Sequence, residues 1–383
     1  MLDGMITKFA REAIFSEEYI SEKESLEFLT NIENFMTISK GIIRELERSG
    51  LSGSVDELYK ILRLKMREQG VAPADATIKS WLMKNILPSR PFAIKICFAL
   101  ELTLESAVTF LNRACFQSGF SPRIAEEVIF YYCLKFGKPY SHAQYLYKLF
   151  KESDGSLSEE QIKGTQFIKN EQDQLQNNDT ALINWLALRK SSFTEKSETA
   201  FNWYSLLKRE VVDAIRSSPG FSDIDKENLE SDIDVEEKDI SYEKLLYYLY
   251  LDIPVVMRGT KKPEADFVSL KDSVISDILT GIPLPEQLKK IERREVSVDR
   301  KTLMTLFFFR CSFNDFADYE SPYDYFYDNM NEILDDCNMG LLYPPNPFDW
   351  LILKSVNSLE VGGENSVVYF NEILKLSFGD EYE

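Results

Sequence analysis

The sequence predicts an all-α protein with two domains, and three observations support this prediction. Glycine and proline are sparse, with 16 and 14 copies among 383 residues, which is unlike a β-rich fold that needs many tight turns. Apolar residues recur every three or four positions along most of the chain, as they do in amphipathic helices. An acidic run over residues 219–241 separates two such regions and has the composition of a linker.

Composition narrows the class of protein further. Hydrophobic residues make up 44% of the chain, which is enough for globular domains with cores of their own. The net charge of −19 argues against general coating of nucleic acid and favours a soluble protein or a basic partner. No two of the five cysteines have the spacing of a zinc site or a redox pair, so we expect buried free thiols, no metal and no cofactor.

Residues 1–53 are predicted to form an N-terminal helical segment. Ser21 followed by Glu24 has the spacing of a capping box, in which the serine oxygen accepts from a backbone amide and the glutamate reaches back to the serine amide. Residues 50–53 begin and end with glycine and provide a linker. We expect this segment to pack on the domain that follows it.

Residues 54–150 are predicted to form the central helical domain. Ser54 and Glu57 make a second capping box, and Gly70 and Pro73 end the helix that it starts. A short helix follows over about 76–84. The apolar stripe of the first helix comprises Val55, Leu58, Leu62 and Met66, and that of the second comprises Ile78, Trp81 and Leu82.

A proline turn opens the next helix. In the segment Pro88-Ser89-Arg90-Pro91, Ser89 or Arg90 is placed as the cap, with Pro91 at or near the first helical position. An apolar helix continues to about Leu100, and Thr103 can cap another helix that runs to about residue 113.

This region resembles the helix-turn-helix of the lambda-repressor-like (XRE-type) bacterial regulators. The resemblance spans about residues 54–115 and rests on 77–82 (Thr-Ile-Lys-Ser-Trp-Leu), on Pro88-Ser89 and on 94–102. In that family the tryptophan belongs to the end of the recognition helix, and Pro-Ser opens the next helix. The family has a full scaffold helix before the recognition helix, whereas only residues 70–75 are present here. The motif is therefore a modified, shortened one.

The resemblance implies a DNA-binding transcription regulator that contacts DNA through residues 54–95. Residues 41–115 hold 11 Lys or Arg against 8 Asp or Glu, a locally basic region on an acidic chain. Bases or phosphates would be approached by Lys79, Ser80 and Lys84, and the DNA backbone would be held by Lys60, Arg63, Lys65, Arg67 and Arg90. The alternative is a helical scaffold, in a phage- or defence-related setting, whose degenerate motif contacts only protein.

Beyond residue 150 the sequence predicts a helical connector over 151–218 and, after the acidic linker, a C-terminal helical domain over 242–383. This acidic, aromatic domain is expected to bind a protein or to dimerise. A weaker basic surface is formed by Lys289, Lys290, Arg293, Arg294, Arg300 and Lys301. The chain as a whole resembles uncharacterised bacterial helix-turn-helix-containing proteins, which implies a bacterial or mobile-element origin but no activity.

No enzyme is predicted. His142 is the only histidine, no nucleophile is paired with a base, and Gly259-Thr260-Lys261 lacks the upstream glycine of a phosphate loop. Carboxylates over 314–328 could hold Mg²⁺ for a nuclease, or they form an acidic loop before an aromatic-faced helix. The first residues contain no apolar signal core, and no apolar run is long enough for a bilayer, so we expect a cytoplasmic protein without membrane contact.

A weak internal repeat is also present. Residues 111–131 and 333–353 align without gaps at an offset of 222, and each copy is predicted to be a helix, a proline turn and a new helix. The matched pairs are Leu111 with Ile333, Cys115 with Cys337, Phe120 with Leu342, Pro122 with Pro344, Glu127 with Asp349 and Ile129 with Leu351. Chance and the shared residue pattern of helices explain these matches about as well as duplication does.

Overall fold

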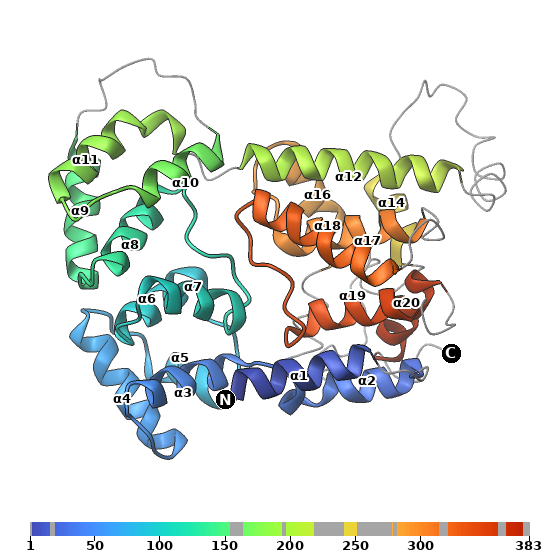
Figure 1. Cartoon of the computed structure of the whole chain (residues 1–383), viewed down its shortest axis with the longest axis horizontal. Helices are drawn as coiled ribbons and strands as arrows, with labels where there is room; N and C mark the ends of the chain where they lie inside the picture. The colour runs from blue at the N-terminus through green and yellow to red at the C-terminus, as the bar shows by residue number, and fades with distance from the viewer. Residues whose placement is uncertain are drawn as a thin grey trace. The chain divides into compact units, whose positions relative to one another are not determined.

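The protein is all-α, which confirms the predicted fold class. The computed structural model describes residues 2–15, 20–153, 164–193, 197–217, 241–250, 278, 282–313, 321–358 and 365–377, and every regular element in these ranges is helical (Figure 1). Nearly all of the acidic run over 219–241 lies outside them. The chain forms two compact units. Unit 1 comprises residues 1–35, 200–333 and 342–383, and unit 2 comprises residues 36–199 and 334–341.

Unit 2 contains nine α-helices among its described residues. They are α3 (Ile38–Arg48), α4 (Val55–Glu68), α5 (Asp75–Met83), α6 (Arg90–Ala99), α7 (Leu104–Arg113), α8 (Ala125–Lys135), α9 (Tyr140–Glu152), α10 (Thr165–Asp173) and α11 (Asp179–Leu188), followed by a 3-10 turn at Lys190–Ser192. One apolar cluster extends through α3 to α9 and reaches α11.

The described helices of unit 1 come from both ends of the sequence. They are α1 (Leu2–Ile14), α2 (Glu22–Thr30), α12 (Glu198–Ser217), α14 (Tyr242–Tyr250), α16 (Pro285–Glu292), α17 (Arg300–Phe313), α18 (Pro322–Asp336), α19 (Pro347–Asn357) and α20 (Ser366–Leu376), with a 3-10 turn at Ile32–Asn34. Helix α18 begins in this unit, and its last residues belong to unit 2.

The N-terminal segment does not pack as the sequence suggested. Helix α1 packs on α19 and α2 packs on α20, so residues 1–35 join the C-terminal helices, and unit 2 begins at Met36 instead of at residue 54. The Phe28 ring stacks on the Trp350 ring with centroids 4.6 Å apart, and Trp350 Nε1 donates to the Ala10 carbonyl at 3.2 Å. Burial of a large aromatic side chain against these helices explains the difference.

The predicted connector is likewise divided between the two units. Helices α10 and α11 belong to unit 2, where α11 packs on α9, and the rest of the connector from Ala200 belongs to unit 1. The Tyr132 hydroxyl donates to Asp179 Oδ1 at 2.8 Å, which ties the start of α11 to α8. This contact joins residues 47 positions apart, so the local helix pattern does not reveal it.

Local sequence signals do determine the helix ends around the motif. Both predicted capping boxes are confirmed, including the one at Ser54, whose side chain accepts from the Glu57 amide while the Glu57 carboxylate accepts from the Ser54 amide. Helix α4 ends just before Gly70, which has a φ of +74° that glycine adopts without strain. Ser89 is the N-cap of α6, and Pro91 lies in its first turn.

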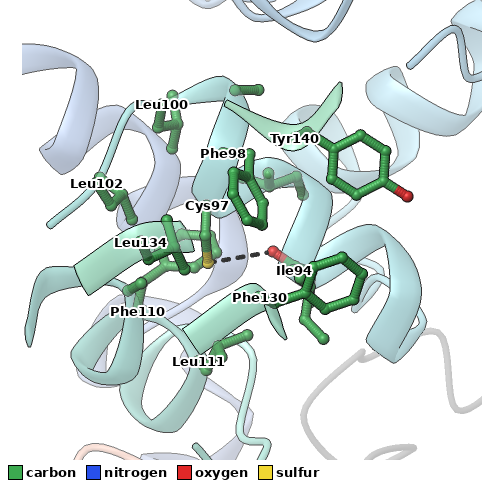
Figure 2. Packing of buried hydrophobic residues seen from close by; sticks show 14 of the residues in the cluster. Ile94, Cys97, Phe98, Leu100, Leu102, Phe110, Leu111, Phe130, Leu134 and Tyr140 are labelled. Atoms are coloured by element: carbon green, nitrogen blue, oxygen red, sulfur yellow. Dashed lines mark hydrogen bonds between the residues drawn. The ribbon is translucent and has the colours of Figure 1, made fainter. Parts of the chain in front are cut away.

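The core of unit 2 is dense and aromatic. Figure 2 shows Cys97 of α6 among apolar side chains of neighbouring helices, with its Sγ 3.3 Å from the Ala93 carbonyl oxygen to which it donates. The rings of Phe98 and Phe130 both contact the Tyr140 ring, with centroids 5.4 and 5.8 Å away. All five cysteines are buried and free, as predicted, and burial raises the pKa of the Cys97 thiol.

A buried lysine in unit 1 provides a stability prediction. Lys354 is 1% exposed, and its Nζ donates to the Ile14 carbonyl at 3.3 Å, where Asn357 Nδ2 also donates at 2.9 Å. Burial lowers the pKa of Lys354 from 10.5 to about 8, so at pH 7 a charge is held in the interior at a disadvantage of about 3 kcal/mol. Lys354→Met should therefore raise the free energy of unfolding by about 2 kcal/mol at pH 7, since Asn357 still satisfies the carbonyl.

The pH dependence follows from the direction of this shift. Above pH 10.5 Lys354 is neutral in both the folded and the unfolded chain, so its burial carries no charge penalty. As the pH falls from 10.5 to 8 the penalty develops in full, and the advantage of the variant should therefore shrink as the pH rises from 8 to 10.5. Urea titrations at pH 7 and 10 measure this change, with Lys375→Met on α20 as a half-exposed control. Equal stability of Lys354→Met and wild type at pH 7 would contradict the assignment of a destabilising buried charge.

Candidate nucleic-acid interface

Helices α4 and α5 carry most of the motif that the sequence singled out for DNA contact, and both lie in unit 2. They pack against each other, α4 also packs against α6, and α3 packs against α5 (Figure 1). No helix lies between Glu68 and Asp75, so the shortened scaffold segment is a loop. Helix α5 buries Ile78, Trp81 and Leu82, and Ser39 Oγ donates to the Leu82 carbonyl at 2.8 Å. These contacts fix which face of α5 meets solvent.

The outward face of α5 carries two of the predicted contact residues. Lys79 and Lys84 are both exposed, and Lys79 Nζ lies 5.4 Å from the centre of the Tyr59 ring of α4. Met83 and Ile86 are also exposed on this side, at 45% and 53%. The face is therefore a mixture of cations and apolar groups.

Helix α4 contributes a stripe of cations beside this face. Lys60, Arg63 and Arg67 recur at intervals of three and four residues, so they share one side of the helix, and Lys60 and Arg67 are exposed. Arg63 Nε lies 2.8 Å from Asp75 Oδ1 at the start of α5. Together with the contact between Lys79 and Tyr59, this ion pair brings the stripe next to α5. We name Lys60, Arg63, Arg67, Lys79 and Lys84 the α4–α5 surface.

Two other predicted contact residues have different surroundings. Lys65 lies 3.7 Å from Glu101 Oε2, and its side chain is only 19% exposed. Ser80 Oγ donates to the Thr77 carbonyl at 2.6 Å, inside its own helix. Neither residue contributes a freely presented cation or hydroxyl to the α4–α5 surface.

The half-buried Arg90 side chain is bound by other groups of unit 2, unlike the expectation that it holds the DNA backbone. Its Nε donates to Glu127 Oε1 at 2.7 Å, and its Nη1 donates to the Ser118 carbonyl at 2.7 Å. Its Nη2 donates to the Gly119 carbonyl and to Glu127 Oε2. These bonds engage the guanidinium with α8 and with the loop before it. We therefore exclude Arg90 from the α4–α5 surface.

Sequence reasoning missed Glu127 as the partner of Arg90. Glu127 is 5% exposed, and it also accepts from the Ser121 amide at 2.7 Å, so both of its oxygens are bonded. A buried glutamate needs such partners. The pairing of Glu127 with Asp349 in the internal repeat was the one sequence signal that pointed to this residue.

The second basic surface is only partly available to an outside ligand. Arg300 forms an ion pair with the buried Asp349, and the Arg294 guanidinium lies 3.4 Å from the centre of the Phe201 ring. Lys290 is exposed, and the Arg293 side chain is 63% exposed, although it lies 3.9 Å from Glu295. Within this region, only Lys290 and Arg293, at the end of α16, are exposed cations.

The remaining polar groups do not assemble a catalytic constellation in the described part of the chain. His142 Nε2 lies 2.8 Å from Asp179 Oδ2, and Tyr132 and Lys138 bind the other oxygen of that carboxylate at 2.8 and 3.2 Å. Within the described ranges no three His, Cys, Asp or Glu side chains converge as metal ligands. Residues 314–320, where part of the suggested Mg²⁺ cluster falls, lie outside those ranges.

Comparison with known proteins adds no relative. The chain matches no protein-family model, no curated protein and no solved structure. Among the described residues, none of the helices has the length and apolar character that crossing a membrane requires. The assignment of a function therefore depends on the surfaces that the two units present.

Proposed function

We propose that the protein is a DNA-binding regulator that contacts DNA phosphates through the α4–α5 surface. The observation that carries this proposal is the exposed pair Lys79, on the outer face of α5, and Lys84, the residue that ends α5, beside the cations of α4. Lysine and arginine on one helical face attract the DNA backbone, and they stand out on a chain with a net charge of −19. Unit 1 would then bind a protein or dimerise.

The pair Lys79→Ala plus Lys84→Ala tests the proposal. Removing two phosphate contacts should weaken binding to a fluorescein-labelled 40-bp duplex roughly 10-fold at low salt and reduce the slope of log affinity against log salt by about 1 to 2 units. Fluorescence anisotropy over a salt series measures both quantities. Lys8→Ala plus Lys148→Ala removes the same charge from side chains that are 77% and 74% exposed elsewhere, and this control should bind like wild type. A pair variant that behaves like this control would overturn the assignment of α5.

A protein-only scaffold is the second candidate, and the exposed Met83 and Ile86 favour it. Exposed apolar side chains beside charged ones are typical of protein–protein contacts. This alternative predicts no salt-dependent retention of DNA, and a protein partner that Met83→Ser plus Ile86→Ser releases on pull-down. Under the DNA-binding proposal the same apolar pair should leave the salt slope unchanged, since it removes no charge.

A further inference from the structure

The connection between α16 and α17 in unit 1 repeats the connection between α5 and α6 in unit 2. In each case the second residue after the helix has a left-handed backbone: Asn85 with φ +52° and Arg294 with φ +59°. The next exposed apolar residue then bonds back across the turn, with Ile86 N–H donating to the Ser80 carbonyl at 3.0 Å and Val296 N–H donating to the Lys290 carbonyl at 3.4 Å. Positions 86 and 296, like 80 and 290, are 210 residues apart, whereas Asn85 and Arg294 are 209 apart, and in unit 1 the Glu295 N–H also donates to the Lys290 carbonyl at 2.8 Å.

Burial follows the same offset of 210. The buried residues Ile78, Trp81 and Pro88 correspond to Leu288, Ile291 and Val298, which are also buried. The exposed Ile86 corresponds to the exposed Val296. At the end of this stretch Arg90 and Arg300 occupy the first positions of α6 and α17. The buried Leu82 corresponds to the half-buried Glu292, so burial agrees at most but not all of these positions.

These two arginines make equivalent ion pairs. Arg300 Nη1 and Nη2 bind Asp349 Oδ1 and Oδ2 at 2.6 and 2.7 Å, just as Arg90 binds both oxygens of Glu127. The Tyr343 amide donates to Asp349 Oδ2 at 2.7 Å, and the Ser121 amide donates to Glu127 Oε2 at 2.7 Å.

The position of the backbone donor makes this correspondence specific. The donor lies six residues before the carboxylate in both units, and both donor and carboxylate obey the sequence offset of 222. The order of elements agrees as well: two helices, a loop that contains proline, and two further helices that pack together, α8 on α9 and α19 on α20. Helix periodicity alone specifies neither a bidentate arginine at a helix start nor the backbone donor that shares its carboxylate.

We propose that the chain contains two copies of one helical module, and that the outer face of α16 is a second nucleic-acid contact, equivalent to that of α5. At the offset of 210, Lys79 and Lys84 correspond to the half-buried Lys289 and Arg294, and the exposed cations Lys290 and Arg293 take the places of Ser80 and Met83. One chain would then engage two stretches of DNA backbone, as a symmetric dimer does with two identical subunits. The contact at α16 is the weaker one, because Glu286 and Glu295 are exposed beside it.

This contact rests on the proposed function, and one titration series separates the two. The full-length chain, Lys290→Ala plus Arg293→Ala, Lys79→Ala plus Lys84→Ala, and all four changes together are titrated onto the labelled 40-bp duplex over a salt series. The α16 pair should weaken binding about 3- to 10-fold and lower the salt slope by about 1 unit. In the fourfold variant the two losses should add on a logarithmic scale, since distant sites act independently. Thermal unfolding of the α16 pair should match wild type, because these are surface changes.

Three other outcomes have distinct meanings. If the α16 pair binds like Lys8→Ala plus Lys148→Ala while the α5 pair is impaired, the second contact is overturned and the proposed function stands. If the α16 pair alone is impaired, the contact at α16 stands and the assignment of α5 falls. If wild type shows no salt-dependent binding to this duplex, both the proposed function and the second contact are overturned.

Discussion

Arg300→Met is expected to lower the free energy of unfolding by about 4 kcal/mol, because it leaves a buried carboxylate without its counter-ion. Asp349 is 0% exposed, and Arg300 supplies both hydrogen bonds along the edge of its carboxylate. In the variant the Tyr343 amide would still donate to this carboxylate, but no cation would be paired with it. Urea denaturation followed by circular dichroism at pH 7 measures the change.

Two controls make this result specific to the buried charge. Arg293→Met, at a side chain that is 63% exposed, should change stability by no more than about 0.5 kcal/mol. Arg300→Met combined with Asp349→Asn should recover at least half of the loss, because asparagine removes the buried charge and keeps an oxygen for the Tyr343 amide. If the single variant lost less than about 1 kcal/mol, the ion pair would not be the element that holds α17 to α19.

Arg90→Met is expected to lower the free energy of unfolding by about 3 kcal/mol without weakening DNA binding at temperatures where the variant is folded. The side chain is 27% exposed, so water compensates part of the loss that a fully buried pair would show. Its partner Glu127 is 7% exposed on the same measure and would keep only the Ser121 amide. Denaturation and anisotropy on the same preparation give the two readouts.

The two readouts distinguish the role of Arg90 as the ion-pair partner of Glu127 from the backbone-contact role that its sequence position suggested. Glu127→Gln in the Arg90→Met background should restore part of the stability, since it removes the buried charge. Lys79→Ala plus Lys84→Ala is the matched comparison, expected to lose affinity while keeping stability. An Arg90→Met variant with wild-type stability and a reduced salt slope would reverse our assignment of this residue.

The sequence was most informative where the cause of a structure is local. The capping boxes at Ser21 and Ser54, the proline turn before α6 and the apolar stripes of α4 and α5 involve residues within a turn or two of each other. These predictions are confirmed except for Val55, which is 39% exposed. The all-α class follows from the same kind of signal. Free, buried cysteines followed from their places in apolar helix patterns.

Long-range contacts were beyond the reach of local patterns. Arg90 looked like a surface cation next to a helix start, and only the fold brings Glu127, 37 residues away, to its guanidinium. Similarly, the packing of α1 on α19 depends on Trp350, which is 340 residues from its hydrogen-bond acceptor Ala10. These long-range contacts place residues 1–35 in unit 1, whereas the sequence pattern predicted that they pack on the domain that follows them.

The internal repeat lies between these two cases. Its second half was visible in the sequence at the offset of 222, but its first half follows the offset of 210 and was hidden from an ungapped alignment. Helices α17 and α18 have 14 and 15 residues, whereas α6 and α7 have 10 each, and these longer helices account for most of the change in offset. DNA binding itself stays a prediction, since the charges of the α4–α5 surface permit it and only an experiment tests it.

The most direct test is recovery of the tagged protein from crosslinked cells of its own source, followed by sequencing of the attached DNA. Our account predicts sharp enrichment at a small number of loci, and loss of that enrichment with Lys79→Ala plus Lys84→Ala but not with Lys8→Ala plus Lys148→Ala. A flat DNA profile together with a stable protein partner would contradict it, and the α4–α5 surface would then be a protein-binding face of a helical scaffold.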